Sequence, residues 1–236
     1  MTNTATRPEL NQEFRNAFSS IAERVVPAKY KPFSLKDLQP SEASRLPLGE
    51  QARLYDEMRA NELAGWAFFA PAGYSKTTCS YALFRRAILA NLKVWWPRQN
   101  EWPKYEWEPE GVCNRIPRIY VWRKSVPDLL QQHFDRFNYV EGEGRERPPK
   151  PAVSVESIEE AVRRGYTPRV FLEEIDKVKP SEFAINQIFR IFDALDRHKG
   201  QLVIDTNLSK QQFMDVYGEP ITRRVKENCI VKEWGF

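Results

Sequence analysis

Cysteine and histidine are scarce in this chain of 236 residues, and long apolar runs are lacking. The three cysteines, Cys79, Cys113 and Cys229, lie far apart, so they predict neither a disulfide framework nor a Cys-x-x-Cys metal site. With only His133 and His198, a histidine-based metal or catalytic centre is disfavoured. No apolar stretch approaches the length of a membrane span, and the first residues are polar. We therefore expect a soluble, cytoplasmic protein without a membrane association.

The chain does contain enough apolar material for one sizeable domain. Hydrophobic residues make up 42% of it, with 7 tryptophans and 14 phenylalanines, which is sufficient for a real core. The formal net charge is +4, a mild basic excess. Such an excess permits contact with nucleic acid but does not require it.

The most informative stretch lies between an apolar run and a long helical pattern. Residues 70–78 read Ala-Pro-Ala-Gly-Tyr-Ser-Lys-Thr-Thr and separate a predicted strand at 66–70 from a predicted helix at 79–91. This layout is typical of a phosphate-binding loop, in which backbone N–H groups and a helix N-terminus bind phosphate oxygens. The sequence therefore predicts a nucleoside triphosphate as ligand and Mg²⁺ as its metal, with the nucleotide bound by Gly73, Tyr74, Ser75, Lys76, Thr77 and Thr78.

Within such a loop, the lysine and the first threonine have separate roles. Lys76 would contact the β- and γ-phosphates, and the hydroxyl of Thr77 would hold Mg²⁺. Ala70 and Ser75 stand where the usual pattern has glycine, and a side chain at position 75 would weaken binding or reshape the loop. The competing interpretation is an ordinary strand, turn and helix in which Lys-Thr occurs by chance.

Predicted strands alternate with predicted helices along the chain. Short apolar runs predict strands at 66–70, 116–122, 169–176, 201–205 and 229–234. Periodic apolar residues and turn signals predict helices at 49–63, 79–91, 125–137, 154–165, 181–199, 210–216 and 219–227. This alternation indicates an α/β domain with a mostly parallel sheet.

Two consecutive acids end the third predicted strand. Glu173 and Glu174 follow the apolar run 170–172, and a phosphate-binding loop needs such a partner because phosphoryl transfer depends on positioning and charge neutralisation. Glu173 would hold the Mg²⁺ shell, and Glu174 would orient and deprotonate the attacking water. Neighbouring side chains on a strand point in opposite directions, which allows these two roles. The alternative is a solvated acidic turn after a core strand.

With these motifs, the chain resembles the AAA+ ATPases of the DnaC/IstB type, which are bacterial helicase loaders and ATP-dependent helpers of transposases. The resemblance rests on the loop, the acidic strand, segment 205–209 (Asp-Thr-Asn-Leu-Ser) and segment 220–225 (Pro-Ile-Thr-Arg-Arg-Val), in agreeing order from about Phe33 onward. It implies a P-loop NTPase (AAA+) core with a parallel five-stranded sheet flanked by helices and no C-terminal helical lid. It divides the chain into an AAA+ domain at 31–236 and a segment at 1–30 that binds a partner or is flexible.

The resemblance also implies roles for two residues outside the loop. Asn207 falls where the family has a polar residue between the acidic strand and the γ-phosphate. Arg224 falls at the arginine finger that acts on a neighbouring subunit's ATP, with Arg223 as the near alternative, so ATP would lie at the interfaces of a homo-oligomer. The competing interpretations are an ordinary asparagine turn and a solvated basic helix face. Glu173 replaces the aspartate that is commoner in the family, and we expect this replacement to slow hydrolysis more than it weakens nucleotide binding.

Two segments and one basic group bear on contact with DNA. The stretch at about 93–117 is a Trp/Pro-rich insertion whose aromatic and basic residues suit stacking on bases. Its glutamates cancel that charge, so a structural or protein-contact role competes. A charged loop follows at 141–152. Arg118, Arg123 and Lys124 form a basic patch around the second predicted strand, for which a solvated face is the alternative.

Together these features predict an ATP-dependent, DNA-associated AAA+ ATPase. It would oligomerise with ATP and recruit or load a partner on DNA, either a replicative helicase or a transposase; the sequence does not separate these partners. The altered loop glycines motivate a second interpretation, an ATP-binding assembly scaffold with little or no hydrolysis. A small-molecule kinase of the P-loop class is a weaker third.

Overall fold

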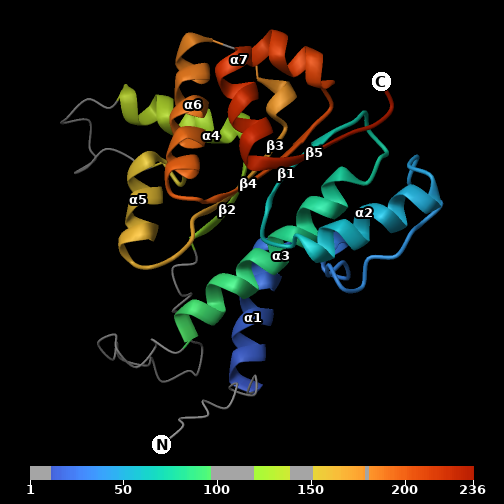
Figure 1. Cartoon of the computed structure of the whole chain (residues 1–236). Coiled ribbons are helices and arrows are strands. Elements are labelled where there is room, and N and C mark those ends of the chain that lie inside the picture. The colour runs from blue at the N-terminus through green and yellow to red at the C-terminus, as the bar shows by residue number, and fades with distance from the viewer. Residues whose placement is uncertain (1–11, 97–119, 139–150, 179–180) are drawn as a thin grey trace, which may run out of the picture.

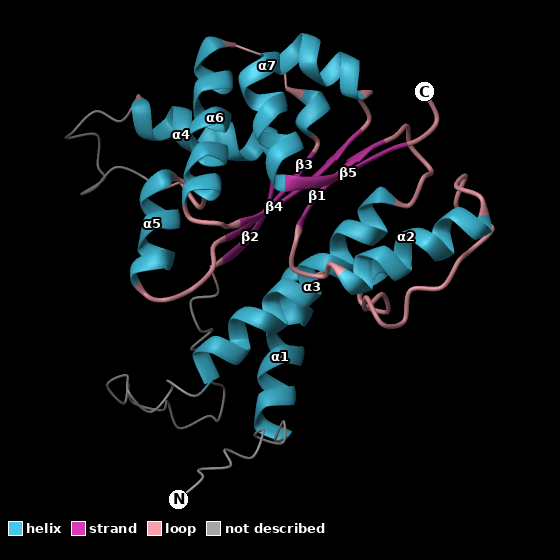
Figure 2. Ribbon diagram, viewed as in Figure 1, coloured by secondary structure: helices cyan, strands magenta, loops and turns pink. Residues whose placement is uncertain are grey.

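A five-stranded parallel sheet lies between two layers of helices in the computed structural model, which describes residues 12–96, 120–138, 151–178 and 181–236 (Figures 1 and 2). The strand order is β2-β3-β4-β1-β5, and every neighbouring pair is parallel. The strands are β1 (Gly65–Phe69), β2 (Val121–Ser125), β3 (Arg169–Glu173), β4 (Gln201–Thr206) and β5 (Cys229–Glu233). The predicted α/β fold with a parallel five-stranded sheet is confirmed.

Alternate residues of the central strands pack into different helical layers. On β1, Trp66 and Phe68 join a core shared with α1 (Gln12–Val25), α2 (Leu48–Ala60) and α3 (Lys76–Trp95). Ala67 and Phe69 face the opposite core, which is shared with the remaining helices: α4 (Val126–Phe137), α5 (Val155–Arg163), α6 (Glu182–Arg197) and α7 (Lys210–Asn228). Because helices cover both faces, the central strands read as continuous apolar runs. Figure 1 shows the two helical layers on either side of the sheet.

Serine side chains fix the starts of four helices. The hydroxyls of Ser125, Ser154, Ser181 and Ser209 each accept a hydrogen bond from the backbone N–H three residues later. The predicted helices at 210–216 and 219–227 form one element, α7, that kinks at Gly218, where φ is 78°. None of the helices in the described ranges is long and apolar enough to cross a membrane.

Two strand boundaries differ from the prediction. β2 runs from Val121 to Ser125 rather than over 116–122, of which 116–119 lie outside the described residues. It continues into a charged stretch because Arg123 finds buried carboxylate partners inside the fold. β3 stops at Glu173 rather than 176, because Glu174 turns into the left-handed backbone region (φ 58°) before the short helix η3 (Ile175–Lys177).

The N-terminal helix packs against the same core as the sheet. Phe14 and Ile21 of α1 are buried in the core that contains α3, and the Phe14 ring meets Trp96 edge-on with centroids 5.2 Å apart. A short helix, η1 (Ala28–Tyr30), follows α1. Most of the predicted Trp/Pro-rich insertion and charged loop lie outside the described residues, as does 1–11. The division of the chain at residue 30 remains a prediction.

We expect Gly65→Ala to destabilise the fold. A Cβ at position 65 would lie 2.2 Å from the carbonyl oxygen of Asn228 and 3.0 Å from that of Leu202, because β1 is enclosed by β4 and β5. The free energy of unfolding should fall by roughly 1–3 kcal/mol, as for other overpacked sites. Urea unfolding measures it, with Gly49→Ala as the matched control, since a Cβ there meets nothing within 4 Å. Equal stabilities for the two variants would contradict this account of the sheet.

Candidate nucleotide site

The carboxyl ends of three parallel strands bring the predicted site together. β1 leads into the loop at 70–75, β3 ends in the two glutamates, and β4 runs into Asn207. Register places β1 beside β4, and β4 beside β3. Ligands of open parallel sheets bind at this edge, so segments far apart in sequence meet where a nucleotide is expected.

The loop keeps a tight backbone although it has lost two glycines. Gly73 (φ 93°) and Ser75 (φ 59°) both adopt the left-handed region, and the Gly73 carbonyl accepts a hydrogen bond from the Arg45 N–H at 2.8 Å. An L-residue in this conformation costs roughly 1–2 kcal/mol, which is the penalty of serine where glycine would be free of strain. Ser75 precedes the first residue of α3, so the helix N-terminus opens on the loop.

Lys76 lies across the loop. Its Nζ donates to the carbonyl oxygens of Ala70 (2.5 Å) and Pro71 (2.8 Å) and to Oδ1 of Asn207 (3.1 Å). Burial lowers the pKa of this ammonium, and the carboxylates of Asp205 and Asp176 partly oppose that shift. The lysine is therefore poised at the strand ends, where it can exchange carbonyl acceptors for phosphate oxygens. The side chains of Tyr74, Thr77 and Thr78 are all partly buried.

Glu173 is held by Arg123, which the sequence analysis assigned to a basic patch and not to this site. Nη2 of Arg123 donates to Oε2 of Glu173 at 2.7 Å and lies 3.5 Å from Oδ2 of Asp205. Only 5% of the Arg123 side chain is exposed, so this residue belongs to the site and not to a solvated basic patch. The patch predicted around the second strand is wrong for Arg123, because neighbouring strands supply two carboxylates that compensate its burial.

Glu174 faces different surroundings from Glu173. Its carboxylate pairs with Lys177, and 43% of its side chain is exposed. The residue is one of three non-glycine positions with positive φ in the described chain. Strained backbone of this kind persists where the surrounding structure fixes it, and Tyr217 of α7 does so by donating a 2.6 Å hydrogen bond to the Ile175 carbonyl. The turn thus presents one acid toward the sheet and the other outward.

Asn207 connects the loop to the acidic turn. Its Oδ1 accepts from Lys76, while Nδ2 donates to Oδ2 of Asp176 at 2.9 Å and its backbone N–H to Oδ1 at 3.3 Å. The asparagine therefore lies between the lysine and the end of the acidic strand, beside the region its predicted role requires. Its contact with Asp176 was not anticipated.

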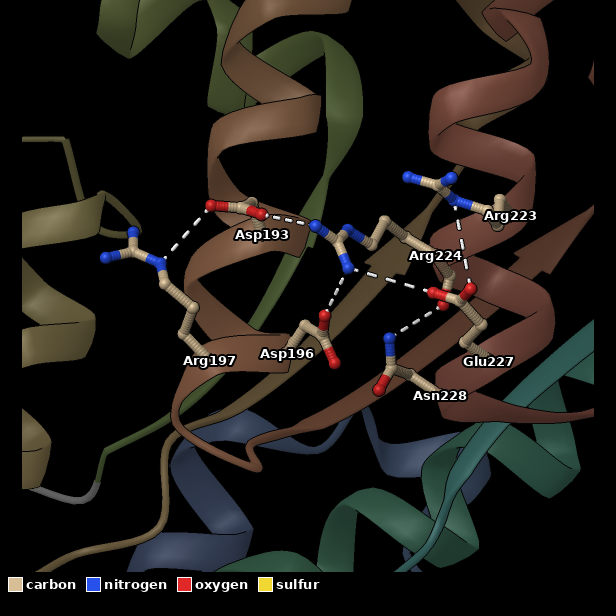
Figure 3. A network of polar contacts seen from close by, with 7 residues as sticks. All are labelled: Asp193, Asp196, Arg197, Arg223, Arg224, Glu227 and Asn228. Atoms are coloured by element: carbon tan, nitrogen blue, oxygen red, sulfur yellow. Dashed lines mark hydrogen bonds and ion pairs between the residues drawn. The ribbon is translucent and has the colours of Figure 1, made fainter.

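Arg224 lies in a network of acids between α6 and α7 (Figure 3). Its guanidinium contacts Asp193 at 2.7 Å and Asp196 at 2.5 Å, with Glu227 at 3.7 Å, and 22% of the side chain is exposed. Arg223 is 62% exposed and has a single long ion pair to Glu227 at 3.8 Å. Among the described residues, no contact joins either arginine to the loop at 70–78, so the finger assignment remains a prediction that needs a second subunit.

The residues present fit Mg²⁺ bound together with a nucleotide. Thr77 offers a hydroxyl and Glu173 a carboxylate, which are the hard oxygen donors that Mg²⁺ prefers. The described part of the chain has no group of three or more histidine, cysteine or acidic side chains arranged for a metal. Mg²⁺ commonly takes its other ligands from phosphate oxygens and water, so a hydroxyl and a carboxylate suffice here.

Sequence reasoning overlooked three contributors: Arg123, Asp176 and Tyr217. Arg123 carried a weak signal, since it directly follows the apolar run that ends at Trp122 and a charge inside a sheet requires a partner. Asp176 follows the glutamates so closely that it reads as part of the same acidic turn. Tyr217 had no signal, because its bond to a backbone carbonyl depends on how α7 packs against the sheet.

Comparison with known proteins establishes the fold. No family model and no curated protein matches the sequence. The structure is similar to the crystal structure of the DnaC helicase loader, with a TM-score of 0.53 and 14% identity over 87% of this chain and 98% of that one. AMPPCP-bound DnaA from Aquifex aeolicus follows with a TM-score of 0.49 and 15% identity, over 85% of this chain and 49% of that one. The chain has the α/β P-loop AAA+ fold. The fold expected from the resemblance is thereby confirmed.

The stability of the chain should depend on the protonation of Asp205. Burial raises the pKa of this carboxyl from 3.8 to about 6, although Arg123 opposes the shift. The folded chain then holds the proton more tightly than the unfolded chain, so the contribution of Asp205 to the free energy of unfolding is lost as pH rises from about 4 to about 6. Asp205→Asn should abolish this step.

Urea unfolding of the wild type and Asp205→Asn at several pH values measures the difference. Relative to the variant, the wild type should lose stability through this window. Asp215→Asn, which removes an exposed carboxyl of α7, controls for the general loss of a charge. Wild-type and Asp205→Asn curves that stay parallel would show that this carboxyl does not titrate differently on folding.

Proposed function

We propose that this chain is an ATP-dependent, DNA-associated ATPase that assembles with copies of itself and recruits or loads a partner protein on DNA. ATP would contact the loop residues and Lys76, with Mg²⁺ held by Thr77 and Glu173. Glu174 would orient the attacking water, and Asn207 would lie near the γ-phosphate. Arg224 would act on the ATP of the neighbouring subunit.

The observation that carries this proposal is the contact between Lys76 and Asn207 at the mouth of the loop. These residues are 131 positions apart, yet Nζ and Oδ1 are 3.1 Å from each other. A chance Lys-Thr after a turn has no reason to meet the end of the strand adjacent to β1. The likeness in fold to a helicase loader supports a replicative helicase as the partner, while a transposase remains the second choice.

An ATP-binding scaffold with little turnover is the second candidate. The pairing of Glu174 with Lys177 favours it, because a carboxylate directed at an ammonium is not directed at the attacking water. Strain at Ser75 adds to this argument. The two candidates share the nucleotide site and differ only in whether bound ATP is hydrolysed.

Lys76→Ala should abolish ATP binding, and Glu174→Gln should retain binding while losing turnover. The lysine supplies the positive charge for the phosphates, whereas the glutamate acts only on the attacking water. Binding is measured with a fluorescent ATP analogue, and turnover by phosphate release with single-stranded DNA, duplex DNA or none. Lys93→Ala, an exposed lysine near the far end of the same helix, is the matched control.

Three outcomes separate the candidates. DNA-stimulated turnover that disappears in Glu174→Gln supports the ATPase. ATP binding with no turnover above that of Glu174→Gln supports the scaffold. Unchanged ATP affinity in Lys76→Ala contradicts the assignment of the loop and both candidates with it.

Arg224→Ala should lose turnover in the assembled state while each subunit still binds ATP. Because a finger acts in trans, mixing Arg224→Ala with Lys76→Ala should restore part of the activity: a Lys76→Ala subunit supplies its arginine to the intact loop of an Arg224→Ala neighbour. Phosphate release from each variant and from the mixture is the measurement, with Lys226→Ala, which removes an exposed cation of the same helix, as the matched control. Full activity of Arg224→Ala alone would remove the finger role from this residue.

A further inference from the structure

A continuous stack of side chains connects the N-terminal segment to Glu173. The ring of Tyr30, in η1, lies on the ring of Tyr81, in α3, with centroids 4.3 Å apart and planes inclined by 17°. The third member of the stack is Arg123, whose guanidinium carbon is 3.7 Å from the centroid of the Tyr81 ring. Arg123 then donates to Glu173. Four elements that are distant in sequence, η1, α3, β2 and β3, are thus joined by direct contacts.

Arg123 is fixed by this stack and by its polar partners together. Nη1 donates to Oγ of Ser80 at 2.7 Å and Nη2 to Glu173, whereas the buried Nε has no hydrogen-bond partner in the described structure. The third hydrogen bond, to Oδ2 of Asp205, is long at 3.5 Å, so contact with the face of Tyr81 contributes to the tilt of the planar group. The cation–π contact between the buried guanidinium and the ring adds an electrostatic attraction, which depends on orientation, to the packing of the two groups. The orientation of Arg123 therefore depends on Tyr81.

Tyr81 depends in turn on Tyr30. The side chain of Tyr81 is buried, and the ring of Tyr30, which is only partly buried, covers it from the outer side. Lys29 lies over Tyr30, with Nζ 4.8 Å from the ring centroid. Movement of η1 would uncover Tyr81 and loosen the support of Arg123. The connection runs from a surface segment to the acid that the proposed function assigns to Mg²⁺.

We infer that Arg123 is a positioning residue for Glu173 and that the Tyr30–Tyr81 stack couples the N-terminal segment to it. This rests on the proposed function, since Glu173 acts there on Mg²⁺. A partner that binds the segment around η1 would alter the position of Arg123 and thereby the metal affinity of the nucleotide site. The same contact would let nucleotide binding change the exposure of the segment, because coupling between two sites is reciprocal.

The test is a double-mutant cycle on the Mg²⁺ dependence of nucleotide binding in the full chain. A fluorescent ATP analogue is titrated at increasing Mg²⁺ in the wild type, Tyr30→Ala, Arg123→Lys and the double variant. Arg123→Lys keeps the charge but loses the flat face and the separate Nη1 and Nη2 donors. It should raise the half-saturating Mg²⁺ concentration by about tenfold or more, as loss of a residue that orients a metal ligand does. Tyr30→Ala should raise it by about threefold to tenfold through the lost ring contact.

The control is Tyr30→Phe, which keeps the stacked ring and should behave as the wild type. In the double variant, the effect should equal that of Arg123→Lys alone, because both changes act through one contact chain. Independent effects that multiply, or a Tyr30→Ala variant with unchanged Mg²⁺ dependence, would overturn the inference while leaving the nucleotide site intact. A wild type that binds no nucleotide would instead overturn the proposed function.

The same cycle is then measured without nucleotide, by urea unfolding. Coupling between positions 30 and 123 in the free energy of unfolding is expected, since both side chains contact the ring of Tyr81. Additive effects there would show that the stack transmits nothing and would overturn the coupling on independent grounds. Tyr30→Phe again serves as the control.

Discussion

Two buried cations lie near carboxylates of β3, β4 and η3 at the carboxyl edge of the sheet. The carboxylates of Asp205 and Asp176 raise the pKa of Lys76 and so oppose the effect of its burial. Arg123 pairs with Glu173 and lies near Asp205. Removing one partner of a buried ion pair leaves an uncompensated charge, which costs about 3–5 kcal/mol. The loop, β2, β3 and β4 therefore depend on one another, and none of them can shift without disturbing the balance of charge under the candidate nucleotide site.

The parallel sheet, covered on both faces, brings these charges together. All strands point the same way, so the polar residues that follow them gather at one edge, while the strands themselves supply apolar residues to two cores. Asp205 shows how sharp the transition is: Ile204 before it is fully buried, and Asn207 two residues later is exposed. Along such a strand, the buried apolar residues and the polar residues of the candidate site are only one or two positions apart.

Local patterns predicted the strands, most helices and the loop, because apolar periodicity and serine caps act within a few residues. They failed where a tertiary partner decides the outcome. β2 extends through Arg123 because this residue pairs with carboxylates of β3 and β4. β3 ends early because Glu174 adopts the left-handed backbone region, next to the Ile175 carbonyl that Tyr217 holds by a hydrogen bond. The presence of Lys76 at the site followed from sequence, whereas its contact with Asn207 required the fold.

The missing loop glycine therefore carries less weight than its sequence suggests. Ser75 adopts the left-handed backbone that glycine would take, so the substitution costs stability, about 1–2 kcal/mol, rather than shape. A loop with its turn intact still directs backbone N–H groups toward an anion, since every residue has one. The stronger reason to doubt rapid hydrolysis lies at Glu174, whose carboxylate is paired with Lys177. Both side chains of that pair are exposed and they are only three residues apart, so the pair contributes little free energy. A bound nucleotide or an adjoining subunit would therefore separate it easily.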